Sequence, residues 1–495
     1  MTVVAGVDSS TQSCTVALFD AANGRRLGQG SSPHSRVAPP VSEQHPDEWW
    51  VAFGRALTAA VADSGSDHIA VDAISVAGQC HGLVALDSAQ QVIRPAKLWN
   101  DTTSSKQAHA LVEVLGPQYW AERTGSVPTA AFTITKLAWM CEEEPDNFRR
   151  IRHILMPHDW LSWRLSGRMF TDRSEASGTG YFDVRTGEWA HDLLDLIDDP
   201  GIPWLETLPT VAGPFDRAGR VTDEAASATG LRPGTVVAAG AGDQHAAALA
   251  LQIGPADLLI SLGTSGVVMT RSGRPCVDLT GLVNGVCAVD EGFLPLACTQ
   301  NATQVTDTMA VWLDVSLAEL AALALAEPVR ASDRPVLVPF LGGERTPNLP
   351  WARGLLGGLD STSTRGGLAR AAFEGVLLGL LQGAQALEAL GLDTGGRLLV
   401  TGGGSRSLAY VQLLADLTGR EVTVLDVPDA TVRGAALQAA ASLSGGTVDE
   451  LAAAWAVPSA PRVAPRAGAD GSVATARYRE MVMWPRHRRM WNEVG

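Results

Sequence analysis

Two similar stretches, far apart in the chain, place the strongest limit on how it can fold. Residues 3–20 read VVAGVDSSTQSCTVALFD, and residues 257–270 read DLLISLGTSGVVMT. In each stretch, two apolar runs flank a short tip of small hydroxyl residues and glycine, which predicts a β-hairpin. Because such a hairpin opens each half of the chain, we predict two related α/β halves that face each other across a cleft.

The length and composition of the chain agree with this organisation. At 495 residues it is longer than one ordinary core supports, so two or three domains are expected. We place one domain over residues 1–245 and a second over residues 246–495. Apolar residues make up 46% of the chain and charged residues 18%, which is typical of a globular protein with large cores.

Charge and targeting signals limit the partners of the chain. A formal net charge of −15, with no basic face in the first 470 residues, disfavours nucleic acid as a ligand. Near the end, the arginines indicate a solvated helix face instead; they are Arg477, Arg479, Arg486, Arg488 and Arg489. The start of the chain lacks an export signal and no apolar run approaches membrane-spanning length, so we expect neither export nor membrane binding.

The six cysteines are spread along the chain without a C-x-x-C spacing. This pattern predicts neither a zinc site nor a disulfide framework. Reduced thiols in a cytoplasmic protein are the simplest interpretation.

Residues 235–246, TVVAAGAGDQHA, place a carboxylate where ligands often bind. A buried strand over 236–239 runs through glycines to Asp243, at the start of an alanine-rich helix. Open α/β sheets bind ligands at the carboxyl ends of their strands, so Asp243 is a candidate general base. Aspartate is also a favoured N-cap residue, and from this stretch alone capping is the stronger interpretation.

Three tips in the chain have the chemistry to hold phosphate. Asp8 ends the first strand of the first hairpin, where a carboxylate can hold the Mg²⁺ that accompanies phosphate oxygens. Backbone N–H groups and hydroxyls of both hairpin tips can bind the oxygens themselves. Residues 401–407, TGGGSRS, follow a strand and can let a ligand lie against bare backbone. An ordinary tight turn is the alternative at the first hairpin tip and at residues 401–407.

Two loops carry side chains suited to a polar ligand. Residues 73–87, AISVAGQCHGLVALD, set Gln79, Cys80 and His81 between two strands, although a hydrogen-bonded structural histidine is the alternative. Residues 98–101, LWND, place Trp99 beside an amide and Asp101, a pairing suited to a polyhydroxylated ligand; a turn after a buried tryptophan is the alternative.

Apolar periodicity predicts the remaining large elements. We expect helices over residues 132–143, 313–326 and 367–390, of which the last is the most clearly amphipathic. Short buried strands are expected over residues 336–341 and 398–400.

Taken together, these stretches resemble the FGGY family of carbohydrate kinases, in order, from residue 4 to about residue 441. Residues 132–143 and 354–374 resemble its two signatures, departing at Ala131 and Gly367. Within the family, GQCHG and LWND are most similar to xylulokinases, and GERTP resembles a shared turn. The resemblance implies two RNase H-like, actin-type ATPase domains that close over ATP and a sugar, and transfer of the γ-phosphoryl group to a sugar hydroxyl.

For the xylulokinase group, the implied reaction converts the ketopentose D-xylulose to D-xylulose 5-phosphate by in-line transfer. The first domain would hold the sugar and the base Asp243, and the second would hold the nucleotide. Asp8 and Asp243 would hold Mg²⁺. The implied sugar contacts are Gln79, Cys80, His81, Trp99, Asp101, Asp243 and Gln244. The implied ATP contacts are Ser10, Thr11, Gln12, Gly263, Thr264, Ser265, Gly402, Gly403, Gly404 and Ser407.

Departures from the family pattern leave the sugar open. Cys80 stands where xylulokinases often have methionine, Gln244 where asparagine is common, and Ser9 and Ser10 where Gly-Thr is more frequent. Ribulose, a pentitol or glycerol are therefore alternative substrates. From a different class, an actin-like ATPase would share the hairpins without phosphorylating a metabolite. The sequence also leaves the oligomeric state open, with a homodimer among the options.

Overall fold

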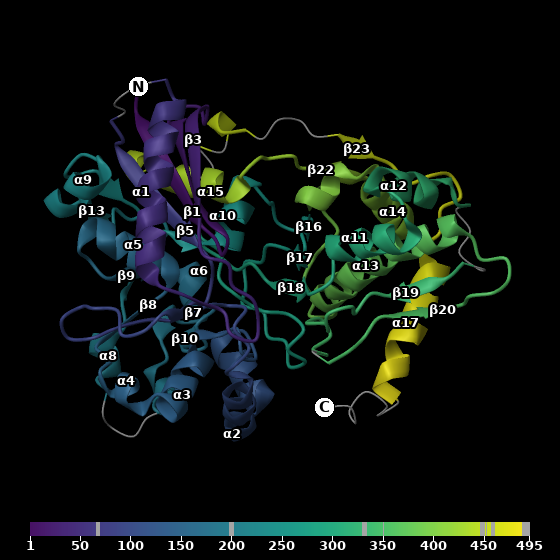
Figure 1. Cartoon of the computed structure of the whole chain (residues 1–495), viewed down its shortest axis with the longest axis horizontal. Helices are drawn as coiled ribbons and strands as arrows, with labels where there is room; N and C mark the ends of the chain where they lie inside the picture. The colour runs from purple at the N-terminus through teal and green to yellow at the C-terminus, as the bar shows by residue number, and fades with distance from the viewer. Residues whose placement is uncertain are drawn as a thin grey trace.

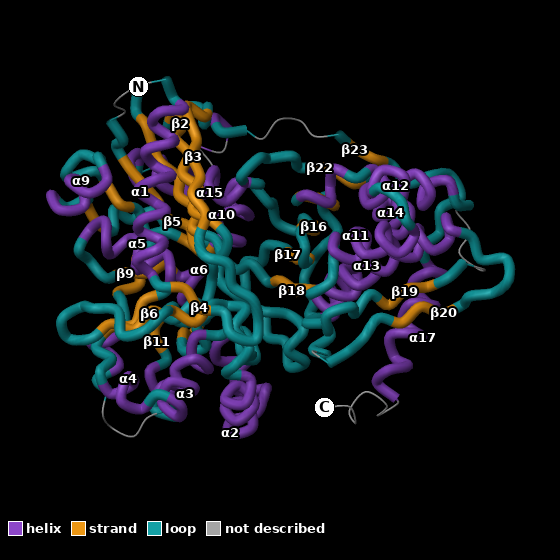
Figure 2. Tube along the Cα trace, viewed as in Figure 1, coloured by secondary structure: helices purple, strands orange, loops and turns teal. Residues whose placement is uncertain are grey.

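The computed structural model describes residues 1–65, 70–197, 202–328, 334–349, 351–445, 451, 453–456 and 461–487. The chain forms two lobes, each built on its own β-sheet (Figure 1). Figure 2 shows helices packed against both sheets and long loops between them. The predicted α/β class with two halves is confirmed.

The sheet of the first lobe has strand order β13-β14-β5-β1-β2-β3, and β15 also pairs with β5. The first hairpin is confirmed, since β1 and β2 are antiparallel. β5 pairs in parallel with β1, and β14 pairs in parallel with β5. The predicted strand over 236–239 is shorter than expected and is continued by β15. These strands are β1 (Val3–Ser9), β2 (Ser13–Asp20), β3 (Arg26–Pro33), β5 (Ala73–Gly78), β13 (Gly219–Arg220), β14 (Val236–Val237) and β15 (Ala241–Gly242).

The sheet of the second lobe repeats this design, with strand order β18-β17-β16-β21-β22-β23. In both lobes a hairpin is followed by a third antiparallel strand, and two later strands add in parallel beside the first strand. The predicted relationship between the two halves is therefore visible in their topology. The strands are β16 (Leu258–Leu262), β17 (Gly266–Met269), β18 (Leu296–Thr299), β21 (Leu398–Thr401), β22 (Val422–Val424) and β23 (Arg462–Val463).

Helices cover both faces of the first sheet. Alternate residues of β1, such as Val3 and Val7, pack toward α1 (Pro46–Asp63), α5 (Pro157–Ser166) and α9 (Asp223–Thr229). Val4, on the opposite face, packs toward α10 (Asp243–Ala250) and α15 (Ala430–Ser444). This alternation is the period-2 pattern of a strand that is buried on both faces.

Insertions between the strands of the first sheet form a smaller region with its own apolar core, around Trp120, Phe132 and Trp204. The predicted helix over 132–143 is confirmed as α3 in this region. The elements of the insertions are α2 (Ser105–Thr124), α3 (Thr133–Glu143), α4 (Pro145–Arg149), α6 (Arg173–Ala176), α7 (His191–Leu194), α8 (Trp204–Thr207), β4 (Glu43–Gln44), β6 (Val84–Leu86), β7 (Ala96–Lys97), β8 (His153–Leu155), β9 (Phe170–Asp172), β10 (Phe182–Asp183), β11 (Glu188–Trp189) and β12 (Thr210–Ala212).

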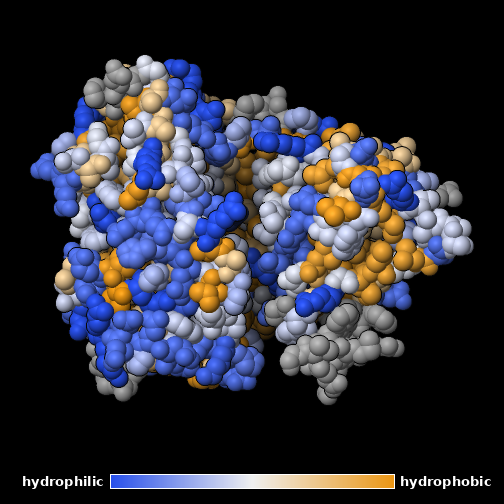
Figure 3. Space-filling model, in the orientation of Figure 1, coloured by the Kyte–Doolittle hydropathy of each residue, from blue (hydrophilic) through white to orange (hydrophobic). Residues whose placement is uncertain are grey.

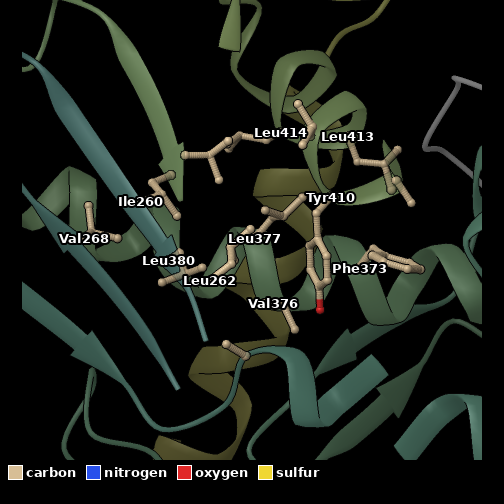
Figure 4. Packing of buried hydrophobic residues seen from close by; sticks show 14 of the residues in the cluster. Ile260, Leu262, Val268, Phe373, Val376, Leu377, Leu380, Tyr410, Leu413 and Leu414 are labelled. Carbon is tan, nitrogen blue, oxygen red and sulfur yellow. The ribbon is translucent and has the colours of Figure 1, made fainter. Parts of the chain in front are cut away.

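The core of the second lobe lies between its sheet and the long helix α13, with Ile260 and Leu262 facing Leu377 and Leu380 (Figure 4). The aromatic rings of Phe373 and Tyr410 meet edge to face at 4.6 Å. The remaining elements are α11 (Thr303–Leu313), α12 (Leu317–Ala326), α13 (Arg365–Ala389), α14 (Leu408–Thr418), α17 (Ser472–His487), the 3₁₀ helix η1 (Gly403–Arg406), β19 (Val336–Val338) and β20 (Leu355–Gly357).

Several predicted bounds in this lobe need correction. The helix expected over 313–326 begins only at Leu317, because Asp314 adopts a left-handed conformation and Ser316 caps the next helix with its hydroxyl. The strand expected over 336–341 ends at Val338, and the amphipathic helix begins at Arg365, two residues earlier than expected.

The packing units differ from the two predicted sequence ranges. The division after residue 245 falls inside α10, and α15, in the second range, packs against β1 and β5 of the first lobe. The apolar side chains of α10 are shared, because Ala246 packs with the first sheet and Ala248 with the second. The first lobe is therefore built from two separate parts of the chain.

Two further sequence predictions concern the end of the chain and membranes. Helix α17 is the predicted C-terminal helix, while Arg488 and Arg489 lie outside the described residues. In the described part of the chain, no single helix is both long and apolar enough to cross a bilayer. The pair α11 and α12 meets the length and composition criteria only when the two are combined, and they are bent by 91° at their junction.

Candidate active site

Three chain segments end at the same edge of the first sheet. Ser9 at the end of β1 lies opposite Gly78 at the end of β5, and Gly78 lies opposite Gly242 at the end of β15. Parallel strands bring their carboxyl ends to one edge. This register therefore brings Asp8, the loop from Gln79 to His81, and Asp243 together.

Asp243 is the first residue of α10, but it does not cap that helix. The N-cap is Gly242, and no side chain makes a capping hydrogen bond. The Asp243 Oδ1 atom accepts a hydrogen bond from the backbone N–H of Gln244 at 2.6 Å, and the Cys80 thiol donates to it at 3.7 Å. Burial raises the pKa of Asp243 to about 6, so the carboxyl is ionised at neutral pH and can accept a proton.

Asp8 lies close enough for its titration to depend on Asp243. Burial and the negative charges of Asp243 and Asp429 raise the pKa of Asp8 well above its ordinary value. Its Oδ1 atom is buried and has no hydrogen-bond partner. A cation would satisfy this oxygen and relieve the repulsion, so the pair fits Mg²⁺. Among the described residues, no three or more His, Cys, Asp or Glu side chains are grouped so that they could hold a metal ion.

His81 is held rigidly in the loop after β5. Its backbone adopts a φ of 65°, and its ring stacks on Phe132 with 5.3 Å between ring centroids. Its backbone N–H donates to the Glu175 carboxyl at 2.5 Å, and Thr133 donates its hydroxyl to the His81 carbonyl. Burial, together with the nearby charge of Lys136, lowers the pKa of His81 to about 3, so its ring is neutral.

Gln79 is buried and linked to the first hairpin tip. The Thr11 hydroxyl donates to the Gln79 Oε1 atom at 3.0 Å and accepts a hydrogen bond from the Trp99 indole N–H at 2.9 Å. Thr11, expected to contact ATP, therefore directs its hydroxyl to two predicted sugar-contacting residues. In the same tip, the Ser10 hydroxyl donates to the Ser13 carbonyl, and Gln12 is exposed.

Asp101, another predicted sugar contact, has both carboxylate oxygens bound by protein groups. It is 1% exposed, and it accepts hydrogen bonds from the backbone N–H groups of Ser42 at 2.8 Å and Thr103 at 3.0 Å. Lys97 lies 3.3 Å from the same carboxylate. In this arrangement Asp101 fixes the loop that carries Trp99.

The predicted phosphate loops of the second lobe also share a sheet edge. β16 and β21 run parallel with Ser261 opposite Thr401, so the 263–265 tip and the 402–404 glycines follow from adjacent strands. Gly402 has a φ of 89°, and a Cβ atom there would lie 2.6 Å from the Leu262 carbonyl oxygen. Only glycine fits such a position. Gly402, Gly403 and Thr264 are exposed, and the Ser407 backbone N–H donates to the Gly404 carbonyl.

The surface is hollowed between the two lobes (Figure 3). From the second lobe, the Arg345 guanidinium lies 5.5 Å from the centroid of the Trp99 ring in the first lobe. Sequence reasoning assigned no role to Arg345 or Glu175. GERTP was a usable signal for Arg345, whereas nothing near Glu175 in the sequence indicated its bond to His81.

Both halves of the chain match one family of known proteins. Residues 3–250 match the N-terminal domain of the FGGY family of carbohydrate kinases, and residues 258–443 match its C-terminal domain. The chain belongs to the FGGY family of carbohydrate kinases. As an FGGY carbohydrate kinase, it transfers a phosphoryl group to a carbohydrate, and the predicted actin-like two-domain fold is the fold of this family.

Similar FGGY proteins include several xylulose kinases. The chain is 40% identical over 461 residues to xylulose kinase of Streptomyces rubiginosus, covering 93% of this chain and 92% of that protein. It is 34% identical to xylulose kinase of Escherichia coli over 78% of this chain and 79% of that one. The crystal structure of xylulose kinase from Bifidobacterium adolescentis matches with a TM-score of 0.85 and 36% identity, over 97% of this chain and 99% of that one.

Proposed function

We propose that this FGGY kinase phosphorylates D-xylulose to D-xylulose 5-phosphate, with ATP as the phosphoryl donor and Asp243 as the general base. The observation that carries the proposal is the position of Asp243. Its carboxylate does not cap α10, and it lies at a sheet edge shared with Asp8 and the Cys80–His81 loop. The names of the similar proteins support the choice of sugar.

In the proposed reaction, Asp243 takes the proton from a sugar hydroxyl while the oxygen of that hydroxyl attacks the γ-phosphorus of ATP. The bond to the bridging oxygen breaks on the opposite side, and ADP leaves. Such a transfer depends mainly on positioning and on neutralising charge. The exposed glycines of the second lobe can approach phosphate oxygens closely with their backbone N–H groups.

We further propose that Asp8 and Asp243 hold the Mg²⁺ that accompanies ATP. The ion would neutralise part of the charge on the phosphate oxygens when bound. The two carboxylates would leave room on the ion for phosphate oxygens and water, as is usual for Mg²⁺ at nucleotide sites. The unpartnered Oδ1 atom of Asp8 supports this assignment.

The substrate is tested with a panel of sugars in an assay coupled to ADP release. D-Xylulose should give the highest kcat/KM among D-xylulose, ribulose, pentitols and glycerol, and mass spectrometry should detect a pentulose phosphate. A higher kcat/KM for another sugar would overturn the named substrate. ATP turnover that needs no sugar and yields no phosphorylated product would instead favour an actin-like ATPase.

Replacement of the proposed base gives the first prediction. Asp243→Asn should lower kcat by about 10²- to 10⁴-fold, because the variant cannot accept the hydroxyl proton, while ATP and sugar still bind. Steady-state kinetics and equilibrium binding measure the two effects. The exposed Asp223, at the start of α9, offers a matched control, and Asp223→Asn should keep wild-type kcat. If Asp243→Asn keeps most of its turnover, Asp243 is not the base.

A further inference from the structure

One arginine of the second lobe reaches into the proposed sugar site of the first. Arg345 lies in the loop between β19 and β20, and its guanidinium sits over the Trp99 ring at 5.5 Å. Trp99 is in turn bonded to Thr11 and, through it, to the buried Gln79. The guanidinium therefore faces an aromatic wall that is itself held in place.

The loop is built to hold this arginine in one position. The neighbouring Glu344 is 4% exposed, and its carboxylate accepts hydrogen bonds from the backbone N–H groups of Gln300 and Arg345 and from the Asn301 amide. On the other side, the Thr346 hydroxyl donates to the Cys298 carbonyl at 2.8 Å. A buried carboxylate with this many donors fixes the backbone on both sides of Arg345.

The Arg345 side chain is not used in any ion pair with the residues that the structure describes. Among other half-buried arginines, Arg466 is paired with a carboxylate. Arg173 and Arg433 donate instead to backbone carbonyls. A guanidinium has five N–H donors in a fixed fork and no acceptor. In a cleft, such donors are suited to a ligand that presents several oxygens.

The contact that Arg345 makes is with the loop of predicted sugar contacts. Its guanidinium lies over the ring of Trp99, whereas Asp243 follows the end of β15.

We propose that Arg345 is a sugar-binding residue supplied by the second lobe, which donates hydrogen bonds to sugar oxygens away from the hydroxyl that is phosphorylated. This inference rests on the proposed function of the site. It makes sugar affinity depend on both lobes, because Trp99 and His81 contact the sugar from one side and Arg345 from the other.

The test compares Arg345→Met with wild type on the best sugar of the panel. Loss of hydrogen bonds from a charged donor should raise KM for the sugar about 10- to 100-fold, with kcat and KM for ATP unchanged. Arg345→Lys keeps the positive charge but loses the planar set of guanidinium donors, so its KM for the sugar should lie between those of wild type and Arg345→Met. Arg353 is exposed on the same loop, and Arg353→Met should match wild type in all three constants.

Two results would overturn the assignment of Arg345 as a sugar-binding residue. Unchanged KM for the sugar in both Arg345 variants means that Arg345 does not bind it, and a fall in kcat alone places its action on the phosphoryl group. Thermal unfolding checks the fold, and Arg345→Lys decides the matter if Arg345→Met does not fold. If wild type prefers a sugar other than D-xylulose, the named substrate fails while Arg345 is still tested on that sugar; activity on none overturns both.

Discussion

At the scale of single residues, Glu175 joins two walls of the active site. Its carboxyl accepts the backbone N–H of His81, and its second oxygen would lie 3.0 Å from a Cβ atom on Gly242, the residue before Asp243. That second oxygen has no partner of its own. Burial raises the pKa of Glu175 to about 8, so the group is mostly protonated at neutral pH. It therefore acts as a neutral link between the sugar loop and the strand end that carries the base.

Glu175→Gln tests this neutral state through the pH dependence of stability. The pKa of Glu175 is about 8 in the folded protein against an ordinary value of 4.5, so its contribution to stability is complete below pH 4.5 and is lost as pH rises through 8. Glutamine does not titrate. The free energy of unfolding of the variant should therefore rise relative to wild type between these pH values and stay level above them.

Urea unfolding of both proteins without ligands, at intervals from pH 5 to pH 9, measures this difference. A constant difference over the whole range would mean that Glu175 is ionised in the folded protein. Glu175→Ala, which removes the acceptor for the His81 N–H, should be less stable than Glu175→Gln at every pH, by about 1–3 kcal/mol.

Site residues could be predicted from the sequence where they lie at the end of a predicted strand. Asp8 and Asp243 were found because each lies at the end of a strand, and the structure brings them to one edge. Glu175 could not be found in this way, since its partner His81 lies 94 residues earlier. Asp101 shows the reverse limit, because a carboxylate suited to a ligand is bound by Ser42, Lys97 and Thr103.

At the scale of elements, α15 approaches its neighbours so closely that glycine is required on both sides. A Cβ atom on Gly434 in α15 would overlap the Ala246 carbonyl oxygen in α10, and one on Gly6 in β1 would overlap the Val432 carbonyl oxygen. Because α10 begins with Asp243, this close packing also sets the position of the proposed base.

Gly434→Ala should therefore destabilise the protein, by about 1–3 kcal/mol, because the added methyl group forces α15 and α10 apart. It should also lower kcat, since Asp243 moves with α10. Gly54, inside α1, has open space around it, so Gly54→Ala should raise the free energy of unfolding by about 0.5–1 kcal/mol and leave kcat unchanged. Denaturant unfolding and kinetics of the pair provide the measurement. Equal stability of the two variants would contradict the close-packing account.

Elements were predicted best where local pattern decides them. The two hairpins and the amphipathic α13 were expected from alternation and from three-and-four spacing, and they are present. The lobe to which α15 belongs was not evident from the sequence. Its alanines would suit either sheet, and its close contacts are with residues far away in the chain, Ala246 and Gly6.

At the scale of the whole molecule, the chain returns to its starting lobe after building the second. Trp455 is 1% exposed and packs on Phe19, with 5.5 Å between ring centroids, and its indole N–H donates to the Ala21 carbonyl at 2.9 Å. Arg433 of α15 lies over the same ring. A division of the sequence into two consecutive domains therefore misses the last part of the first lobe, which no local pattern indicates.

Trp455→Ala tests whether this returning segment stabilises the first lobe. Removing a fully buried tryptophan leaves a cavity and an unpaired carbonyl at Ala21, so the free energy of unfolding should fall by about 3–5 kcal/mol. Trp312, which is 60% exposed on α11, provides the matched control, and Trp312→Ala should change stability by less than about 0.5 kcal/mol. Hydrogen exchange locates the effect: amides of β1 and β2 should lose protection in Trp455→Ala, while those of β16 and β17 keep it. Equal loss in both sheets would mean that the two lobes unfold as one unit, with α10 and α15 transmitting the damage between them.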